Sequence, residues 1–306
     1  MKISIIIPVY NKAEYLDRCF ESIFRQSFAD FEVLAVEDGS TDDSAAVCDQ
    51  WAEREPRLRV FHKDNGGVTA ARRYGLERSE GQYIMFVDAD DRLADDALQH
   101  LYNTVKQYRA DEVIAPFVTH TGVASPVVYE SWVNPDVLIR DIVAGRNRFP
   151  VLWSILFRKE ILQNALNLPR DIIEGEDKLM QVKVLMQHPT VYFTTHPAYV
   201  YTIGLPNSRR HTLQREILYD RLLRQVLFPR KEEFRTVFVL HQLREYEQFI
   251  LDGEFSVRKD YYKKAIGTLP VGISCYHRLV YMLPPVLARP VIRLYRQLIN
   301  LKQKGL

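Results

Sequence analysis

Three carboxylates crowd the end of an apolar run near residue 90. Residues 83–87 are YIMFV, and Asp88, Asp90 and Asp91 follow at once with only Ala89 among them. Such a run is typical of a buried strand, and ligands of open α/β sheets collect where strands end. Crowded carboxylates repel one another unless a cation joins them. The segment therefore predicts either a divalent metal that holds a phosphorylated ligand, or a solvated acidic turn that caps a helix starting near Leu93.

The first third of the chain alternates apolar runs with amphipathic segments. The runs at 3–9, 31–36 and 58–62 predict strands, and apolar residues at helical spacing in 16–24 predict a helix with Asn11 as its N-cap. Alternation with short links predicts an α/β fold, a mostly parallel sheet with helices on both faces. Farther along, strands are predicted at 113–118 and 127–129.

Polar side chains follow each predicted strand. They are Tyr10, Glu37, Asp38, Lys63, Asp88, Asp90 and Asp91. Singly, each has an ordinary explanation, such as a half-buried tyrosine, a turn with a helix cap, or a tight turn at Gly66 and Gly67. The pair Arg72 and Arg73 could likewise be one solvated helix face. Because the carboxyl ends of parallel strands meet at one edge, their shared placement favours a binding site there.

Four segments resemble motifs of the family 2 glycosyltransferases with the GT-A fold. They are PVYN at 8–11, VEDGSTD at 36–42, NGGVTAAR at 65–72 and DADD at 88–91, in the family's order and spacing. The resemblance is strong to about residue 105 and weaker to about residue 205. It implies a Rossmann-like GT-A catalytic domain over residues 1–210. The sequence pattern from Leu213 onward predicts helices, so we expect a helical extension over residues 211–306.

The resemblance also implies roles for individual residues. Asp88 and Asp90 would be the DXD acids that bind Mn²⁺ or Mg²⁺, with Asp90 the more direct ligand. Asp91, from its place in the segment, is expected to cap the next helix. Pro8 and Tyr10 would hold a uracil ring, Asp38 would accept a hydrogen bond from its N3–H, and Arg72 would lie beside the diphosphate. The nucleotide-binding set is then Pro8, Tyr10, Glu37, Asp38, Lys63, Gly66, Arg72, Asp88 and Asp90. Glu37 stands where an aspartate is usual, and Arg73 where an asparagine is common.

A candidate catalytic base follows Gly175. Glu176 and Asp177 open a predicted helix, where acids are also stabilised by the helix dipole alone. The resemblance implies Asp177 as the base, with Glu176 second. One carboxylate is enough to deprotonate an acceptor hydroxyl, and a metal can neutralise the leaving diphosphate without a general acid. A glycoside hydrolase, by contrast, usually needs two carboxyl groups.

These inferences predict an inverting transferase that uses a UDP-sugar donor and a carbohydrate or glycolipid acceptor. One alternative is a non-catalytic nucleotide-sugar binding protein that kept the fold. Another is a nucleotidyltransferase, but such an enzyme is expected to have a glycine-rich, basic loop where residues 8–12 are PVYNK. Trp153 is predicted either to stack on an acceptor sugar or to pack in the core. Tyr201 and the segment 207–211 are predicted to close over the diphosphate, unless they form an ordinary basic loop.

The C-terminal region is basic and amphipathic. Leucines 287, 294, 298 and 301 form an apolar stripe among arginines and lysines, which suits either a membrane interface or packing on the catalytic domain or a partner. The net charge of +2 does not call for nucleic acid. The N-terminal apolar run is too short for a signal peptide, and Cys19 and Cys48 lie on apolar helix faces. We therefore expect a cytoplasmic protein with buried free thiols, either free or peripheral on the inner face of the plasma membrane.

Overall fold

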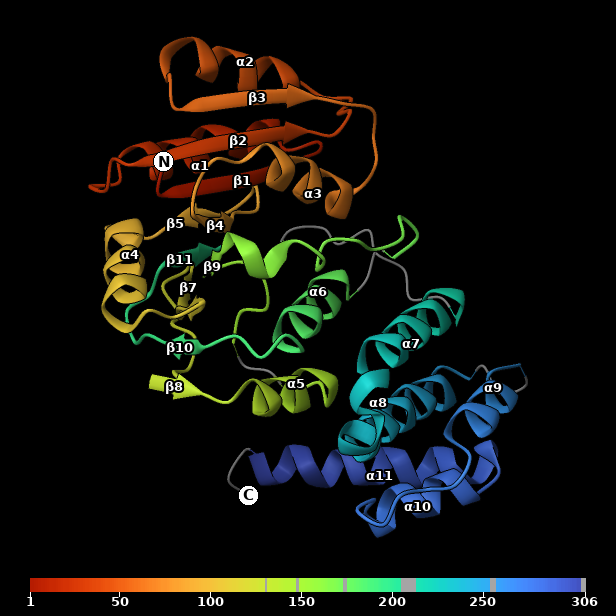
Figure 1. Cartoon of the computed structure of the whole chain (residues 1–306). Helices are drawn as coiled ribbons and strands as arrows, with labels where there is room; N and C mark the ends of the chain where they lie inside the picture. Colours follow the sequence, from red (N-terminus) through yellow and green to blue (C-terminus); the bar gives the residue numbers. More distant parts are fainter. Residues whose placement is uncertain (130, 147–148, 173–174, 205–212, 254–256, 304–306) are drawn as a thin grey trace. The chain divides into compact units, whose positions relative to one another are not determined.

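The structure, a computed structural model, divides into two compact units (Figure 1). It describes residues 1–129, 131–146, 149–172, 175–204, 213–253 and 257–303. The first unit contains residues 1–139 and 147–219, and the second contains residues 140–146 and 220–306. The boundary predicted near residue 210 falls within 205–212, outside the described residues.

An eight-stranded sheet forms the centre of the first unit, within its described residues. Its strands are β1 (Ile3–Val9), β2 (Phe31–Glu37), β3 (Leu58–His62), β4 (Tyr83–Phe86), β6 (Glu112–Ile114), β8 (Ser131–Val133), β9 (Ile155–Arg158) and β10 (Val191–Phe193). Their order is β3-β2-β1-β4-β9-β6-β10-β8. Only β8 and β9 run against their neighbours, so the predicted mostly parallel sheet is confirmed.

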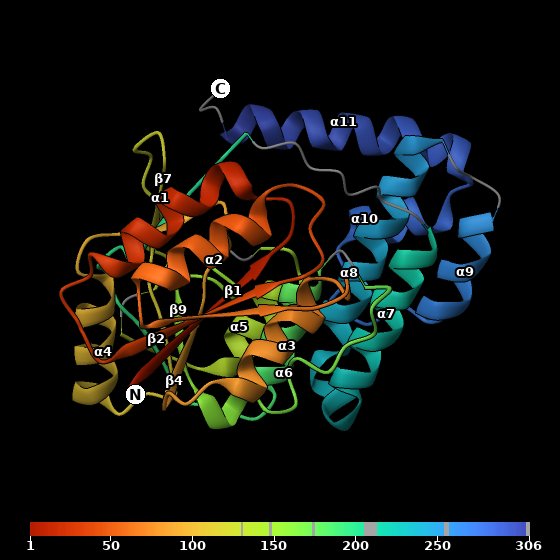
Figure 2. The same cartoon turned by 90° about the horizontal axis from the view of Figure 1, so that it is seen from above.

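Helices cover both faces of this sheet (Figure 2). Alternate residues of β1, such as Ile5 and Ile7, share one core with α1 (Ala13–Phe24), α2 (Ser44–Arg54) and α4 (Ala97–Tyr108). The opposite side chain, Ile6, faces α3 (Val68–Arg78). A β-carbon added at Gly75 of α3 would lie 2.6 Å from Cγ2 of Ile6, so α3 can approach β1 this closely only with glycine there. Burial on both faces explains why β1 reads as a continuous apolar run.

A second, three-stranded sheet lies in the described part of the first unit. It consists of β5 (Arg92–Leu93), β11 (Tyr199–Tyr201) and β7 (Phe117–Thr119), with β11 in the middle. The start predicted for the next helix, near Leu93, is therefore wrong, because residues 92–93 pair with β11 and the helix, α4, begins only at Ala97. The pairing brings residues 199–202 next to the acidic segment 88–91.

Prolines account for two further corrections. The strand predicted over 113–118 is two strands in different sheets, because Pro116 between them has no N–H to donate to a ladder. No strand forms at 127–129 either, where Pro126 precedes the segment; the next strand is β8. Both errors come from reading an apolar run without its proline.

The remaining described elements are mostly helical. They are α5 (Pro135–Val143), α6 (Glu176–Leu185), α7 (Leu213–Leu227), α8 (Lys231–Asp252), α9 (Val257–Ile266), α10 (Cys275–Met282) and α11 (Pro285–Gln303), with short 3₁₀ turns at Lys159–Leu162 and Phe228–Arg230. The predicted helical C-terminal region is confirmed. No helix in the described ranges is long and apolar enough to cross a membrane. Cys19 and Cys48 are buried free thiols, as predicted.

One buried acid in this core has a measurable consequence. Glu112 of β6 is fully buried, and Gln181 of α6 donates a hydrogen bond to it. Burial raises the pKa of Glu112 to about 8, although the bond from Gln181 acts to lower it. The folded protein therefore holds a proton that the unfolded chain releases above its ordinary pKa of 4.5. By linkage, this group makes the fold less stable as pH rises from about 4.5 to about 8.

We predict that Glu112→Gln removes this loss of stability. Urea unfolding at pH 5 and pH 8 should show the variant gaining about 1 kcal/mol or more over the wild type at the higher pH. Glu53→Gln, at an exposed position of α2, is the control and should follow the wild type at both values. An equal pH dependence in wild type and Glu112→Gln would contradict the prediction.

Candidate functional site

A cleft of about 810 Å³ opens in the first unit where β1, β2 and β4 end. Its size is that of an ordinary small-molecule site. Among the predicted site residues, those that line it are Pro8, Tyr10, Asp38, Arg72, Asp88, Asp90, Glu176 and Asp177. Glu37, Lys63 and Gly66 were predicted too, but they are not among its lining residues. The sheet edge thus brings together residues far apart in sequence.

The loops after β1 and β2 are bonded to each other. The backbone N–H of Asn11 donates to Oγ of Ser40 at 3.1 Å, and Oδ1 of Asn11 accepts from the N–H of Thr41 at 2.8 Å. Asn11 has a positive φ of 51° and does not cap α1, so the predicted N-cap is wrong. The first N–H of α1, on Ala13, instead donates to Oδ2 of Asp42 at 3.1 Å. Asp42, from the loop after β2, therefore caps the start of α1. Tyr10, just before Asn11, lines the cleft.

Asp38 joins β2 to the start of α3. Its Oδ1 accepts from the backbone N–H of Gly66 at 2.9 Å and from Nζ of Lys63, and its Oδ2 accepts from the N–H of Gly67 at 2.7 Å. The carboxylate is buried. Lys63 and Gly66 thus contribute to the site by fixing Asp38. A ligand N–H at Asp38 would share an oxygen that already accepts from the protein, which a carboxylate's several lone pairs permit.

Glu37 supports the adjacent loop and points elsewhere. Its Oε1 accepts from the N–H of Ser40 at 2.5 Å, and its Oε2 lies 3.4 Å from Nδ1 of His62. Burial acts to raise the pKa of Glu37, but the hydrogen bonds from Ser40 prevail and the pKa is lowered. The structure therefore gives Glu37 the role of holding residues 38–40 in place.

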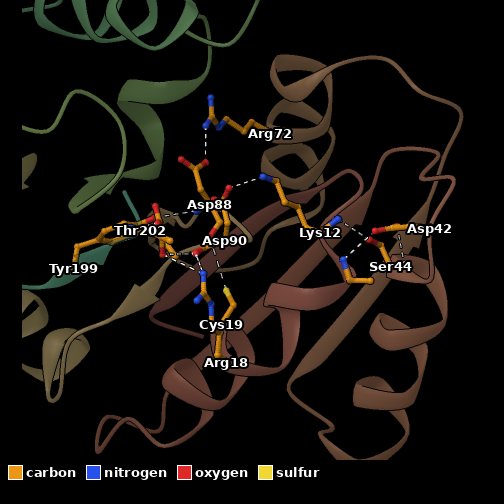
Figure 3. A network of polar contacts seen from close by, with 12 residues as sticks. Lys12, Arg18, Cys19, Asp42, Ser44, Arg72, Asp88, Asp90, Tyr199 and Thr202 are labelled. Carbon is orange, nitrogen blue, oxygen red and sulfur yellow. Dashed lines mark hydrogen bonds and ion pairs between the residues drawn. The ribbon is translucent and has the colours of Figure 1, made fainter. Parts of the chain in front are cut away.

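Two of the acids at 88–91, Asp88 and Asp90, are each paired with a cation that lines the same cleft (Figure 3). Nη2 of Arg72 donates to Oδ1 of Asp88 at 2.9 Å, and Nζ of Lys12 donates to Oδ2 of Asp90 at 2.5 Å. Arg72 is buried, yet within the described residues Nε and Nη1 of its guanidinium have no hydrogen-bond partner. Buried donors are almost always paired, so these atoms indicate a place for an anion beside Asp88.

The backbone of the same segment is held by β11 and α1. The N–H of Asp88 donates to the hydroxyl of Tyr199 at 3.0 Å. The carbonyl of Asp90 accepts from Oγ1 of Thr202 at 2.6 Å and from Nη2 of Arg18 at 2.7 Å. Figure 3 shows these groups converging on the acidic segment. Hydrogen bonds to the main chain of Asp88 and Asp90 therefore fix the positions of their carboxylates.

Asp91 helps to hold the acidic segment against the residues after β11. The prediction that it caps the next helix is wrong. Its side chain is buried, and its Oδ1 accepts from the backbone N–H of Thr202 at 2.7 Å. Burial, followed by the charge of Asp88, raises its pKa to about 7. The prediction failed because residues 92–93 enter β5, which carries the chain away from the start of α4.

Sequence reasoning missed four residues of this network. Lys12 lies just before α1 and Arg18 lies in it, while Tyr199 lies in β11 and Thr202 directly follows it. Lys12 had a signal, because it directly follows the PVYN motif. Tyr199 and Thr202 had none, since each bonds a partner 111 residues away in sequence.

The two candidate bases open α6 at the same cleft. Gly175 before them has a φ of 72°, and a β-carbon there would lie 2.7 Å from the ring of Tyr219. Glu176 is buried, whereas Asp177 is half-buried and its Oδ1 accepts from the backbone N–H of Lys178 at 2.8 Å. Asp177 is therefore the more accessible of the two carboxylates at the cleft.

Two aromatic rings form one wall of the cleft. Trp153 and Tyr201 stack with their centroids 5.1 Å apart and their planes 8° apart, and Phe117 packs edge-on against Trp153 at 4.8 Å. Trp153 is thus packed against other rings and also lines the cleft, while its stacking on an acceptor sugar stays a prediction. The segment 207–211, predicted to close over the site, lies outside the described residues.

The side chains at the cleft supply only some of the ligands that a divalent cation needs. Within the described residues, no group of three or more His, Cys, Asp or Glu side chains converges to hold a metal. Asp88 and Asp90 do offer two hard carboxylates at one cleft, and Mg²⁺ is commonly bound by one or two carboxylates together with ligand phosphates. The donor set therefore fits a metal that arrives with a phosphorylated ligand.

Comparison with known proteins agrees with this architecture. The model of the family "Glycosyl transferase family 2" matches residues 4–166, more than half of the chain. The uncharacterized glycosyltransferase EpsJ of Bacillus subtilis (strain 168) is 30% identical over 214 residues, 67% of this chain and 62% of that protein. Poly(ribitol-phosphate) beta-glucosyltransferase of Bacillus spizizenii is 29% identical over 208 residues, 66% of this chain and 32% of that protein. The matches thus cover less than two thirds of either relative.

Two solved structures share the fold. S. aureus TarS residues 1–349 in complex with UDP-GlcNAc has a TM-score of 0.62 at 20% identity, covering 100% of this chain and 92% of that one. Mannosyltransferase PcManGT from Pyrobaculum calidifontis, in complex with GDP-Man and Mn²⁺, has a TM-score of 0.55 at 18% identity, covering 96% and 87%. The predicted GT-A fold is confirmed.

We predict that Arg72 and its neighbour Arg73 differ sharply in anion binding. Arg72→Lys should weaken binding of a nucleoside diphosphate by about tenfold or more, because lysine cannot bond Asp88 and an anion through one planar fork. Arg73 is exposed, with Nε 3.9 Å from Oε1 of Glu77, so Arg73→Lys is the matched control. Isothermal titration calorimetry on folded variants measures both. Equal affinities for the two variants would contradict the assignment.

Proposed function

The chain belongs to glycosyl transferase family 2, and we propose from that premise that it moves a sugar from a UDP-sugar to a hydroxyl of a glycan or lipid-linked glycan. The observation that carries the proposal is the convergence of Asp38, Arg72, Asp88, Asp90 and Asp177 on one cleft. Asp38 would bind the nucleobase and Arg72 the diphosphate. Asp88 and Asp90 would hold a metal, and Asp177 is the candidate general base. No single one would suffice, but a nucleotide-sugar needs all of them at once.

The donor half of the proposal rests on the end of the cleft near β1 and β2. Pro8 and Tyr10 line it there and would hold the uracil ring, while Asp38 would accept from the uracil N3–H. The unpartnered Nε and Nη1 of Arg72 would bind the diphosphate. The TarS complex supports a uridine nucleotide, since a protein of the same fold binds UDP-GlcNAc.

A divalent metal is proposed to arrive with the donor. Asp88 and Asp90 would hold it, and when bound it would offset the charge that develops on the leaving diphosphate. PcManGT, which has the same fold, binds Mn²⁺ together with its donor. In this chain Lys12 must then release Oδ2 of Asp90, its 2.5 Å partner, and Lys12 would remain beside the phosphates as a second positive group.

The chemical step we propose is a single in-line displacement. Asp177 takes the proton from the acceptor hydroxyl as the acceptor oxygen bonds to the anomeric carbon. The bond from that carbon to the diphosphate oxygen breaks on the opposite side, and Arg72 stabilises the oxygen that departs. One displacement inverts the anomeric configuration.

Trp153 and Tyr201 form an aromatic wall of the cleft on which a sugar ring would stack. We propose that the reaction takes place in the cytoplasm.

The acceptor class is supported by a relative. The matched Bacillus spizizenii protein is a poly(ribitol-phosphate) beta-glucosyltransferase, and a polymeric acceptor suits the role that we propose in cell-surface polysaccharide or glycolipid synthesis. The proposal is tested by incubating the protein and Mn²⁺ with a panel of nucleotide-sugars and measuring release of the nucleoside diphosphate. One UDP-sugar should be hydrolysed well above the rest. Binding without turnover of any donor would favour the non-catalytic alternative.

We predict that Asp177→Asn separates catalysis from binding. The transfer rate should fall by about 10²- to 10⁴-fold, because the general base is lost, while the dissociation constant for UDP stays within about twofold. Asp171→Asn, an exposed acid in the preceding segment, is the control and should keep full activity. If Glu176→Gln instead abolishes transfer and Asp177→Asn does not, the base has been assigned to the wrong acid.

We predict that Asp90→Asn impairs metal binding without unfolding the protein. Titration of Mn²⁺ in the presence of UDP, followed by electron paramagnetic resonance, should show at least about tenfold weaker binding, since a charged ligand is lost. Asp95→Asn is the control because that side chain is 85% exposed and pairs with Arg25 at 3.1 Å. Unchanged Mn²⁺ affinity in Asp90→Asn would remove the metal role.

A further inference from the structure

Large apolar side chains lie exposed on α10 and α11 of the second unit. Met282 is 78% exposed, Val286 70%, Leu287 57%, Leu294 59% and Leu298 52%. Isolated apolar residues are normal on a surface, but a group of this size on two consecutive helices marks an interaction site.

The exposed leucines lie on a face of α11 that is not covered by the described residues. Ala288 and Ile292 of α11 are fully buried, on the side that contacts α8. Leu287, Leu294 and Leu298 are spaced i, i+7 and i+11, so they share a different face of the helix.

Two contacts fix α11 in this orientation. Nη2 of Arg289 donates to the carbonyl of Leu251 in α8 at 2.8 Å, and the ring of Tyr295 stacks on Tyr276 of α10 at 3.6 Å. The helix is therefore anchored, and the exposure of its leucines is a built feature of the second unit.

Charge selects the occupant of this surface. The chain has 41 lysines and arginines and 39 acids, but residues 261–306 hold eight of the former and none of the latter. The formal charge is therefore +8 over these residues and −6 over the rest. Arg293 and Lys264 are exposed among them. A second copy of so positive a surface would be repelled, and nucleic acid would leave the leucines in water.

We propose that the α10–α11 surface docks on an anionic lipid bilayer. The leucines enter the boundary between headgroups and acyl chains, while the basic side chains lie at the level of the lipid phosphates. The proposal is independent of donor chemistry. It gives the protein a means of reaching an acceptor carried on a membrane lipid.

Vesicle flotation with the full-length protein tests the proposal. The protein should float with vesicles of 70% phosphatidylcholine and 30% phosphatidylglycerol, and much less with phosphatidylcholine alone. The double variant Leu294→Glu, Leu298→Glu should bind at least about tenfold more weakly, because apolar burial is lost and negative charge is added. Val123→Glu changes a side chain that is 63% exposed in the first unit, and it should float like the wild type.

Two further measurements separate the contributions. Arg293→Gln should weaken binding to anionic vesicles about fivefold, whereas Lys106→Gln on α4, also exposed, should not. Leu294→Trp should be quenched by brominated lipid more than the wild type, and Val123→Trp should not. Equal flotation on neutral and anionic vesicles would overturn the proposal. So would unchanged binding of the double variant, or a dimer in sedimentation that the same variant dissociates.

Discussion

The site depends on how this protein tolerates Asp88, Asp90 and Asp91 at the end of one strand. Arg72 and Lys12 neutralise the first two carboxylates, one each. The third is buried, and its pKa rises to about 7 because burial and the charge of Asp88 both disfavour ionisation. Such an arrangement is costly unless the surroundings over-determine it, and functional sites are where proteins accept that cost.

Several parts of the fold follow from that constraint. The three-stranded sheet exists beside the main one, and its middle strand brings Tyr199 and Thr202 to the acidic segment. Arg18 connects α1 to the same carbonyl of Asp90. The loops after β1 and β2 are bonded to each other, and Asp38 fixes the start of α3. The cleft is therefore lined by groups whose positions are held from behind, which favours catalysis by reducing the reorganisation needed on binding.

The main sheet and the cleft could be predicted because their signals are local. An apolar run that ends in Tyr10, Asp38 or Asp88 is visible in a few residues, and one topological rule then places the ends together. The small sheet could not be predicted, because β5 is two residues long and pairs with a strand over 100 residues away. The predictions for the cap of α1 and for Asp91 failed for the same reason. The cap by Asp42 and the burial of Asp91 both depend on tertiary contacts that outweigh local preference.

In the function proposed here, one carboxylate serves the acceptor and the end of the cleft with Arg72 and Lys12 holds the leaving group. A single displacement is the simplest chemistry that this division allows, and it fixes the stereochemistry of the product. Proton NMR of the glycoside formed from an α-linked UDP-sugar tests the account most directly. The account predicts a β-anomeric product from the first turnover. An α-anomeric product would mean retention, and it would contradict both the role of Asp177 and the single in-line displacement.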